Sequence, residues 1–328
     1  MAEESSVLVC YGTEKFLKDE YISRQMEKWV DPELRDFALI RYDLTETSLD
    51  EVLDEAETAP FLAERKLILA SSALFFTGAK DTSKVEHRTD RLLAYLSAPA
   101  PYTKLILTVD AEKLDERKKL VKTFKEKKAI KPFAPLSAEE LPGWLEQRAK
   151  KHGVTFERTA VERFLLFTGG QLQAMDAELA KLALYAGEGA SIDVSTVEKL
   201  VVKSAEQNVF LLMEDIVRRR LDKAMDQLHE LLKQKEEPIK LVMLMARQFR
   251  LILQVKDLYA QGYSQQQTAT HLGSHPYPVK LAAEQGRSYH QDQLKRILTE
   301  LADLDYAMKT GRVDKVLGLE LLLLKLAA

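Results

Sequence analysis

The sequence predicts an α/β domain with a parallel sheet, followed by two all-helical domains. Three observations lead to this fold class. Over roughly the first 135 residues, short apolar runs alternate with amphipathic stretches, which is typical of parallel strands joined by helices. After about residue 136 the strand patterns nearly vanish, and about the last 120 residues carry helical periodicity throughout. We therefore expect domains at 1–136, 137–207 and 208–328.

The first domain is expected to contain five strands. Their apolar runs occupy 7–12, 38–43, 66–70, 104–110 and 129–133. Helical patterns lie between them, for example at 13–29, 49–58 and 115–127. The helix at 49–58 has the clearest ends, because Ser48 and Glu51 have the spacing of a capping box and Pro60 stops the helix.

The second domain is expected to be a small helical unit. Its first helix is expected to open on a second capping box, Ser137 and Glu140, and to stop at Gly153. Further helices are expected at 159–168, 171–186 and 195–202. The polar segment 203–208 is typical of a linker and leads into the third domain.

The third domain is expected to be all helix. The helical patterns occupy 209–220, 222–235, 238–261, 264–272, 276–286, 290–310 and 313–327. The last of them is apolar on two faces, one formed by Leu319, Leu322, Leu323 and Leu326 and the other by Leu317, Leu321 and Leu324. A helix with two apolar faces is covered on two sides. The second cover is either a neighbouring subunit or the helix's own bundle, and the residues alone favour neither.

Composition and charge exclude several classes of protein. The net charge of -3 and the pI of about 6.2 argue against binding of nucleic acid through the protein's overall field. A single cysteine, Cys10, excludes a disulfide framework and favours a reducing compartment. The N-terminal segment MAEESS has no signal-peptide pattern, and charges interrupt the apolar runs before they reach membrane-spanning length. We expect a cytoplasmic protein with no membrane partner.

The sequence lacks the motifs of nucleotide and metal chemistry. A phosphate loop needs the pattern G-x-x-x-x-G-K-[ST], but after the first strand Gly12 is followed by Glu14, which would face the phosphates. His271 and His275 have the spacing of a metal pair, yet Gly273 breaks the helix that would aim them at one ion. We expect no catalytic residue, no metal and no cofactor in this chain.

Two segments give weaker indications of nucleic-acid binding. The basic stretch around Lys118, Lys119 and Lys122 supplies candidate DNA contacts, although a solvated helix face is the favoured interpretation. Residues 263–285 have the residue spacing typical of a helix-turn-helix. The second helix offers only Lys280 as a cation, however, which favours a plain helical hairpin. A DNA-binding regulator with a helix-turn-helix is one alternative function for this chain, and a stand-alone ATPase is another.

The stretch TAPFLAERKLILA places two bulky apolar residues, Phe61 and Leu62, in a loop between Pro60 and charged residues. Such a pair either covers the protein's own core or contacts another protein. On the residues alone we favour the first interpretation slightly.

Three segments, in this order and at these distances, make the chain resemble the delta subunits of bacterial DNA polymerase III clamp loaders. They are VLVCYGTEKFLKDE, TGGQLQAMDAELAKLALYAG and DLDYAMKTGRVDKVLGLELLLLKL. The resemblance covers the whole chain. It implies a degenerate AAA+-like domain of the P-loop NTPase type without its phosphate loop, then a helical lid and a helical collar. The lid carries Gln171 where a working AAA+ protein usually has a phosphate-sensing arginine.

The resemblance also implies a function. Delta subunits bind the sliding clamp, or beta subunit, and open the ring for loading onto primed DNA, without hydrolysing ATP themselves. Their collars join the ATPase subunits and delta-prime. This chain would then have no catalytic activity alone but would be a subunit of the DNA-directed DNA polymerase III holoenzyme, a nucleotidyltransferase complex.

Finally, the resemblance assigns roles to residues. The clamp-binding element of these subunits is an apolar pair just ahead of a core strand, which places it at Phe61 and Leu62 with Pro60. The order here is Phe-Leu, whereas the family pattern is Leu-Phe. The nearby segment ALFF, 73–76, follows the strand and is not assigned. The second face of the last helix, with Leu317, Leu321 and Leu324, becomes the expected oligomer interface.

Overall fold

The computed structural model describes residues 5–79 and 85–327. The first four residues of the MAEESS segment therefore lie outside the described residues. The chain divides into two compact units, Met1–Pro135 and Leu136–Ala328. The first predicted boundary lies one residue from this division, whereas the further boundary at 207/208 stays a prediction.

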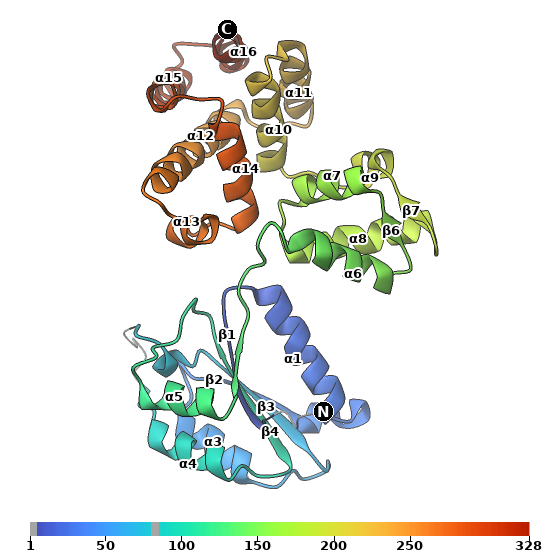
Figure 1. Ribbon diagram of the computed structural model, residues 1–328, viewed down its shortest axis with the longest axis vertical. Helices are drawn as coiled ribbons and strands as arrows, with labels where there is room; N and C mark the ends of the chain where they lie inside the picture. Colours follow the sequence, from blue (N-terminus) through green and yellow to red (C-terminus); the bar gives the residue numbers. More distant parts are fainter. Residues whose placement is uncertain (1–4, 80–84, 328) are drawn as a thin grey trace. The chain divides into compact units, whose positions relative to one another are not determined.

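The N-terminal unit is built on a five-stranded sheet with the order β2-β3-β4-β1-β5 (Figure 1). The strands are β1 (Val7–Tyr11), β2 (Leu39–Asp43), β3 (Lys66–Ser71), β4 (Thr103–Val109) and β5 (Ile130–Pro132). Every pair of neighbouring strands is parallel. All five predicted strands are thus confirmed, and so is the parallel α/β fold class.

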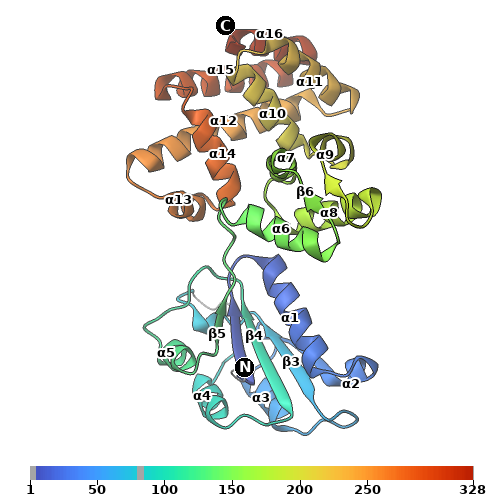
Figure 2. The same cartoon turned by 45° about the vertical axis from the view of Figure 1, so that its right-hand side comes forward.

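Alternate residues of the strands point to opposite faces, and each face has its own core. Val9 and Leu107 belong to the core under α3, α4 and α5, whereas Cys10 and Ile106 belong to the core under α1. The sheet is therefore the middle of three layers, as Figure 2 shows. Cys10 is fully buried in this second core.

The helical segments of this unit largely follow the sequence patterns. They are α1 (Lys15–Trp29), η1 (Pro32–Leu34), α2 (Arg35–Ala38), α3 (Leu49–Glu57), η2 (Leu74–Phe76), α4 (Thr89–Ser97) and α5 (Lys119–Glu126). The capping box of Ser48 and Glu51 forms as predicted. The predicted start of α5 at 115 is wrong, because the Asp115 carboxylate accepts the Arg117 N–H and holds a turn there. Helix α4 was not predicted.

The first part of the C-terminal unit contains four helices and two very short strands. They are α6 (Leu141–Lys151), β6 (Thr155–Phe156), α7 (Arg158–Thr168), α8 (Leu172–Ala186), β7 (Ser191–Ile192) and α9 (Val194–Leu200). The predicted helix start at Ser137 is wrong. The Ser137 N–H does donate to the Glu140 carboxylate at 2.8 Å, but this contact closes a turn that precedes the helix. The parallel pair of β6 and β7 was not predicted.

Seven helices follow. They are α10 (Ala205–Val217), α11 (Leu221–Lys233), α12 (Pro238–Ala260), α13 (Gln265–Leu272), α14 (Pro276–Gly286), α15 (Gln291–Lys309) and α16 (Lys315–Ala327). The predicted linker at 203–208 is wrong over most of its length. Ser204 and Gln207 form a capping box that starts α10 at Ala205.

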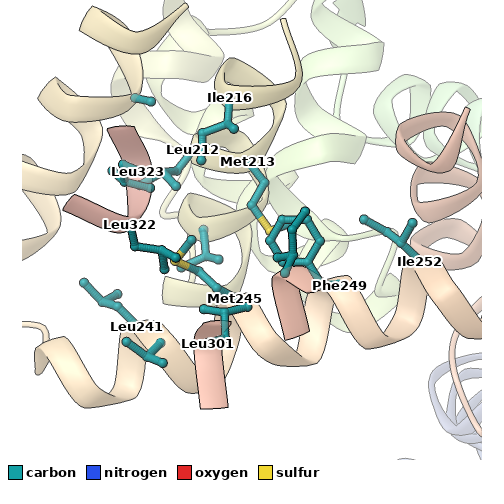
Figure 3. Close-up of a cluster of buried hydrophobic side chains, with 14 of the residues drawn as sticks. Leu212, Met213, Ile216, Leu241, Met245, Phe249, Ile252, Leu301, Leu322 and Leu323 are labelled. Carbon is teal, nitrogen blue, oxygen red and sulfur yellow. The ribbon is translucent and has the colours of Figure 1, made fainter. Parts of the chain in front are cut away.

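These seven helices share one hydrophobic core, which we call the collar core. Helix α12 lies at its centre and contacts α10, α14, α15 and α16. Met245 and Phe249 of α12 meet Met213 of α10 and Leu322 of α16 (Figure 3). No helix among the described residues is both long enough and apolar enough to cross a bilayer.

Candidate protein-binding site

The loop between α3 and β3 holds its two largest apolar side chains in solvent. We call residues 60–65 the tip. Phe61 is 94% exposed and Leu62 is 53% exposed. A side chain that covers a core would have lost most of its accessible surface, so the interpretation of this pair as a core cover is wrong. An exposed Phe-Leu pair in a loop is the kind of feature that marks an interaction site.

The C-terminal end of α3, which leads into the tip, is held by two side chains at the start of β4. The last carbonyl oxygens of a helix have no partner within the helix. Here the Ala56 carbonyl accepts the Thr103 hydroxyl at 2.8 Å, and the Glu57 carbonyl accepts the Tyr102 hydroxyl at 2.5 Å. The tip thus follows a helix end at which these two carbonyl oxygens already have hydrogen-bond partners.

Lys66, which follows the tip, anchors its other end. Its side chain is only 2% exposed, and its ammonium group lies 2.5 Å from Glu55 Oε1 and also donates to the Glu55 carbonyl. The backbone N–H of Lys66 donates to the Tyr102 carbonyl at 2.8 Å. Both ends of the tip are therefore fixed to α3 and β4.

Trp29, at the end of α1, fixes the same segment from the other face of the sheet. Its indole Nε1 donates to the Lys66 carbonyl at 2.9 Å. The guanidinium of Arg65 lies over its ring, 4.8 Å from the centroid. The sequence predicted no role for Trp29, Glu55 or Lys66. A lysine at the start of a buried apolar strand was a usable signal, since a buried charge requires a partner.

The alternative apolar segment, 73–76, lies in the core instead. Phe76 of η2 is fully buried and packs edge-on against Phe124, with ring centroids 5.2 Å apart. Ala73 is also fully buried. This agrees with the prediction that the segment is not the contact element.

The turn after β1 is closed where a phosphate loop would open. A Cβ on Gly12 would lie 1.9 Å from the Phe133 carbonyl oxygen. The Glu14 carboxylate accepts the Phe16 N–H at the start of α1, and burial raises the pKa of Glu14. The buried ammonium of Lys18 donates to the Gly12 carbonyl at 3.1 Å and pairs with Asp110. The positive N-terminal end of α1 therefore already faces the Glu14 carboxylate of the chain itself.

The three candidate DNA contacts differ in their surroundings. Lys118 precedes α5, and its ammonium donates to the Phe75 and Thr77 carbonyls at 2.9 and 2.7 Å. Lys119 and Lys122 are exposed on α5. The ammonium groups of Lys119 and Lys122 can therefore reach a DNA phosphate without first breaking hydrogen bonds to carbonyls, unlike that of Lys118. DNA contact stays a prediction for all three.

Helix α16 has one buried and one exposed apolar face. Leu319, Leu322 and Leu323 lie in the collar core and are at most 5% exposed. On the other face Leu317, Leu321 and Leu324 are 50%, 48% and 46% exposed. The two-faced pattern is confirmed, and within this chain the second face is not fully covered. Its role as an oligomer interface stays a prediction.

The segment 263–285 forms α13 and α14, and α14 is largely buried. Tyr277, Val279 and Ala282 are at most 6% exposed, and burial raises the pKa of Tyr277. The half-buried His275 caps α14, because its Nδ1 accepts the Tyr277 N–H at 3.3 Å. A helix that packs its side chains into its own domain makes a poor reader of DNA bases. Within 5–79 and 85–327, no cluster of three His, Cys, Asp or Glu side chains has the arrangement of a metal site.

Two family models match the sequence. The model for the DNA polymerase III delta subunit matches residues 8–133, and the model for the C-terminal domain of the same subunit matches residues 206–326. DNA polymerase III subunit delta of Bacillus subtilis is 41% identical over 324 residues, which is 99% of this chain and 93% of that protein. This chain belongs to the DNA polymerase III delta-subunit family.

More distant and structural relatives agree with the delta-subunit assignment. A probable DNA polymerase III subunit delta of Aquifex aeolicus is 20% identical over 94% of this chain and 88% of its own length. The solved structure of the Bacillus subtilis DNA clamp loader delta protein superposes with a TM-score of 0.84 at 41% identity, covering 99% of this chain and 96% of that one. The resemblance to delta subunits is thereby confirmed. The chain is a clamp-loader delta subunit of DNA replication, and the regulator alternative is not favoured.

Proposed function

We propose that this delta subunit binds the sliding clamp through the tip and opens the ring for loading onto primed DNA. The observation that carries the proposal is the presentation of Phe61 and Leu62. Two bulky apolar side chains stand in solvent on a short loop, and Lys66, Glu55 and Trp29 fix the base of that loop. Such a loop loses little conformational entropy when it binds.

The energetics of the pair suit a contact with a pocket. Full burial of a Phe or Leu side chain contributes about 1.5–3 kcal/mol. Large apolar side chains that enter a pocket near the centre of an interface commonly act as hot spots. Pro60 precedes the pair and restricts the backbone with which the loop leaves α3.

Ring opening needs no chemistry from this chain. If the tip binds an opened clamp interface more tightly than a closed one, the population of open rings rises by the difference in affinity. The closed turn at Gly12 and Glu14 supports a subunit that does this without hydrolysing ATP. ATP on neighbouring subunits would then control access to the tip.

The collar supplies the proposed contacts with the other loader subunits, the ATPase subunits and delta-prime. The exposed face of α16, with Leu317, Leu321 and Leu324, is the proposed contact surface. Lys119 and Lys122 are the proposed contacts with primed DNA in the assembly, and we propose that the subunit works in the cytoplasm.

The experiment is a binding titration of the full chain with the sliding clamp of the same organism. Phe61→Ala/Leu62→Ala is expected to weaken binding by about 3–5 kcal/mol, roughly a hundred- to several-thousand-fold, because both anchors are lost. Circular dichroism should show an unchanged fold. Unchanged affinity in the folded double variant would refute the proposed tip contact.

A matched control is available in α8. Leu184 and Tyr185 are also consecutive and apolar, and they are 88% and 58% exposed. Leu184→Ala/Tyr185→Ala removes a similar exposed surface far along the chain from the tip. It should leave clamp affinity unchanged, which would show that the effect belongs to the tip and not to exposed apolar surface in general.

A further inference from the structure

The proposed tip contact, on which this inference rests, is too small to be the whole interface. We propose that the same clamp also covers Phe37 on α2. The clamp-binding surface then runs from the tip, past the N-terminal ends of β3 and β2, to Phe37. We call Phe37, Trp29, Arg65, Phe61 and Leu62 the edge surface. The occupant is one molecule, the sliding clamp.

Phe37 is an exposed aromatic residue that the fold of its own chain does not use. Its side chain is 61% exposed, whereas the next residue, Ala38, is fully buried. Helix α2 is only four residues long, and it is anchored through Ala38 in the core under α1. The backbone is therefore held by Ala38 while the ring of Phe37 faces out.

Phe37 and the tip lie at the same edge of the sheet. Strands β2 and β3 are parallel neighbours with Leu39 beside Leu67, and adjacent strands are about 4.8 Å apart. Phe37 comes two residues before Leu39, and Arg65 comes two residues before Leu67. Since parallel strands begin at one edge, α2 and the tip both approach that edge.

A shared cluster of side chains joins the two segments. Ala38, which follows Phe37, and Ala63, which follows Leu62, belong to the same hydrophobic cluster, and so does Trp29. Figure 2 shows α2 next to the C-terminal end of α1, where Trp29 lies. The exposed rings of Phe37 and Phe61 thus flank a common buried patch.

The size of stable interfaces requires a surface of this extent. A specific protein–protein interface covers about 800 Å² on each partner, a disc roughly 30 Å across. An aromatic side chain buries about 150–250 Å², and Leu62 is smaller and only 53% exposed, so Phe61 and Leu62 together supply less than half of that area. A partner that buries both must therefore cover their surroundings on the same edge.

The chemistry of the edge surface is that of an interface centre. Aromatic residues and arginine are enriched at such centres, whereas lysine and acidic residues are depleted. Arg65 is held over Trp29, at 4.8 Å from the ring centroid, so its guanidinium is already placed beside the tip. Phe37 and Phe61 supply rings with few rotatable bonds, which lose little entropy on binding.

The test is a clamp titration of the full chain with Phe37→Ala, alongside the tip double variant. Tyr185→Ala is the matched control, because Tyr185 is an aromatic residue with a similar exposure of 58%. Phe37→Ala is expected to weaken clamp binding about 5- to 30-fold, and Tyr185→Ala to leave it within about twofold. Phe37→Leu should recover part of the loss.

The outcomes separate this inference from the proposed function. If Phe37→Ala binds like Tyr185→Ala while the tip double variant loses affinity, the edge surface is refuted and the tip contact stands. If neither loses affinity, both are refuted. A Phe37→Ala defect in assembly with loader subunits, with normal clamp affinity, would also refute the inference.

Hydrogen exchange of the unaltered chain gives a check that does not depend on any variant. Clamp addition should slow amide exchange in α2 together with exchange in the tip. Protection of the tip alone would overturn the edge surface.

Discussion

The ammonium group of Lys66 lies 2.5 Å from the Glu55 carboxylate, across the base of the exposed tip. Lys66 is the first residue after the tip, and its side chain is 2% exposed, whereas that of Glu55 is 32% exposed. The pair joins the residues on both sides of the loop. The two members are not equivalent. The buried Lys66 ammonium depends on the Glu55 carboxylate as its counter-charge, whereas the partly exposed Glu55 carboxylate can be hydrated without Lys66.

This asymmetry gives the first prediction. Glu55→Ala leaves a buried ammonium with only a carbonyl oxygen as its partner, whereas Lys66→Met leaves a carboxylate that water can reach. Removal of one partner of a fully buried pair costs about 3–5 kcal/mol. For the partly exposed Glu55 we expect a loss of about 2–3 kcal/mol and a smaller loss for Lys66→Met. Urea unfolding measures both, and an equal or reversed order would contradict the argument.

The second prediction concerns the two faces of α16. Leu321→Gln changes a side chain that is 48% exposed, so the free energy of unfolding should change by less than about 0.5 kcal/mol. Leu319→Gln places an amide in the collar core, where the side chain is fully buried, and should cost at least about 3 kcal/mol. Chemical denaturation measures the difference.

Leu321→Gln also tests the proposed interface when the loader is reconstituted. Leu321→Gln should weaken incorporation of the folded chain, as measured by size-exclusion chromatography with the other subunits. Normal incorporation of a combined Leu317→Gln/Leu321→Gln/Leu324→Gln variant would contradict the role of this face.

The third prediction concerns the closed turn after β1. Gly12 has a φ of 134°, and an added Cβ would meet the Phe133 backbone at 1.9 Å. Gly12→Ala should therefore destabilise the N-terminal unit by more than about 2 kcal/mol. Gly189→Ala is the control, because Gly189 also has a positive φ but open space around it, and about 1 kcal/mol is expected there. Thermal unfolding of the two variants should differ clearly. Equal midpoints would show that the turn can relax.

The fourth prediction is a dependence on pH. Burial lowers the pKa of His275, whose Nδ1 accepts the Tyr277 N–H and so caps α14 while the ring is neutral. In the unfolded chain histidine has a pKa of about 6.5 and binds the proton more readily. Stability contributed by this group is therefore present above about pH 6.5 and is lost as the pH falls below it.

His275→Asn keeps an N-cap acceptor and removes the titration. Urea unfolding at pH 8 and pH 5.5 should show a smaller loss of stability for the variant than for the natural chain. Identical losses would assign the pH dependence to other groups.

The strands of the N-terminal unit could be predicted because their composition determines their burial. Runs such as VLVCY and KLILA are apolar at nearly every position, and only a sheet covered on both faces buries them all. By contrast β6 and β7 are two residues each and carry no periodicity. The start of α10 could have been found, since Ser204 and Gln207 have capping-box spacing, but the polar sequence around them is equally typical of a loop.

The candidate site was predictable only in part. Local sequence places Phe61 and Leu62 in a loop but cannot determine which way they face, because an apolar loop residue packs inward or outward according to tertiary contacts. The family resemblance supplied the position. Glu55, Lys66 and Trp29 come from three elements that meet only in the folded chain, so no local pattern shows that they fix the tip.

The high exposure of Phe61 and Leu62 has a consequence for how such a protein can change over time. Substitutions at residues that contribute little to the core have little effect on folding. The scaffold around the tip keeps its anchors whatever side chains stand at positions 61 and 62. Affinity for one partner, or a switch to another, can therefore evolve by exchange of two side chains on an unchanged framework, and an engineer could graft other short recognition sequences at the same place.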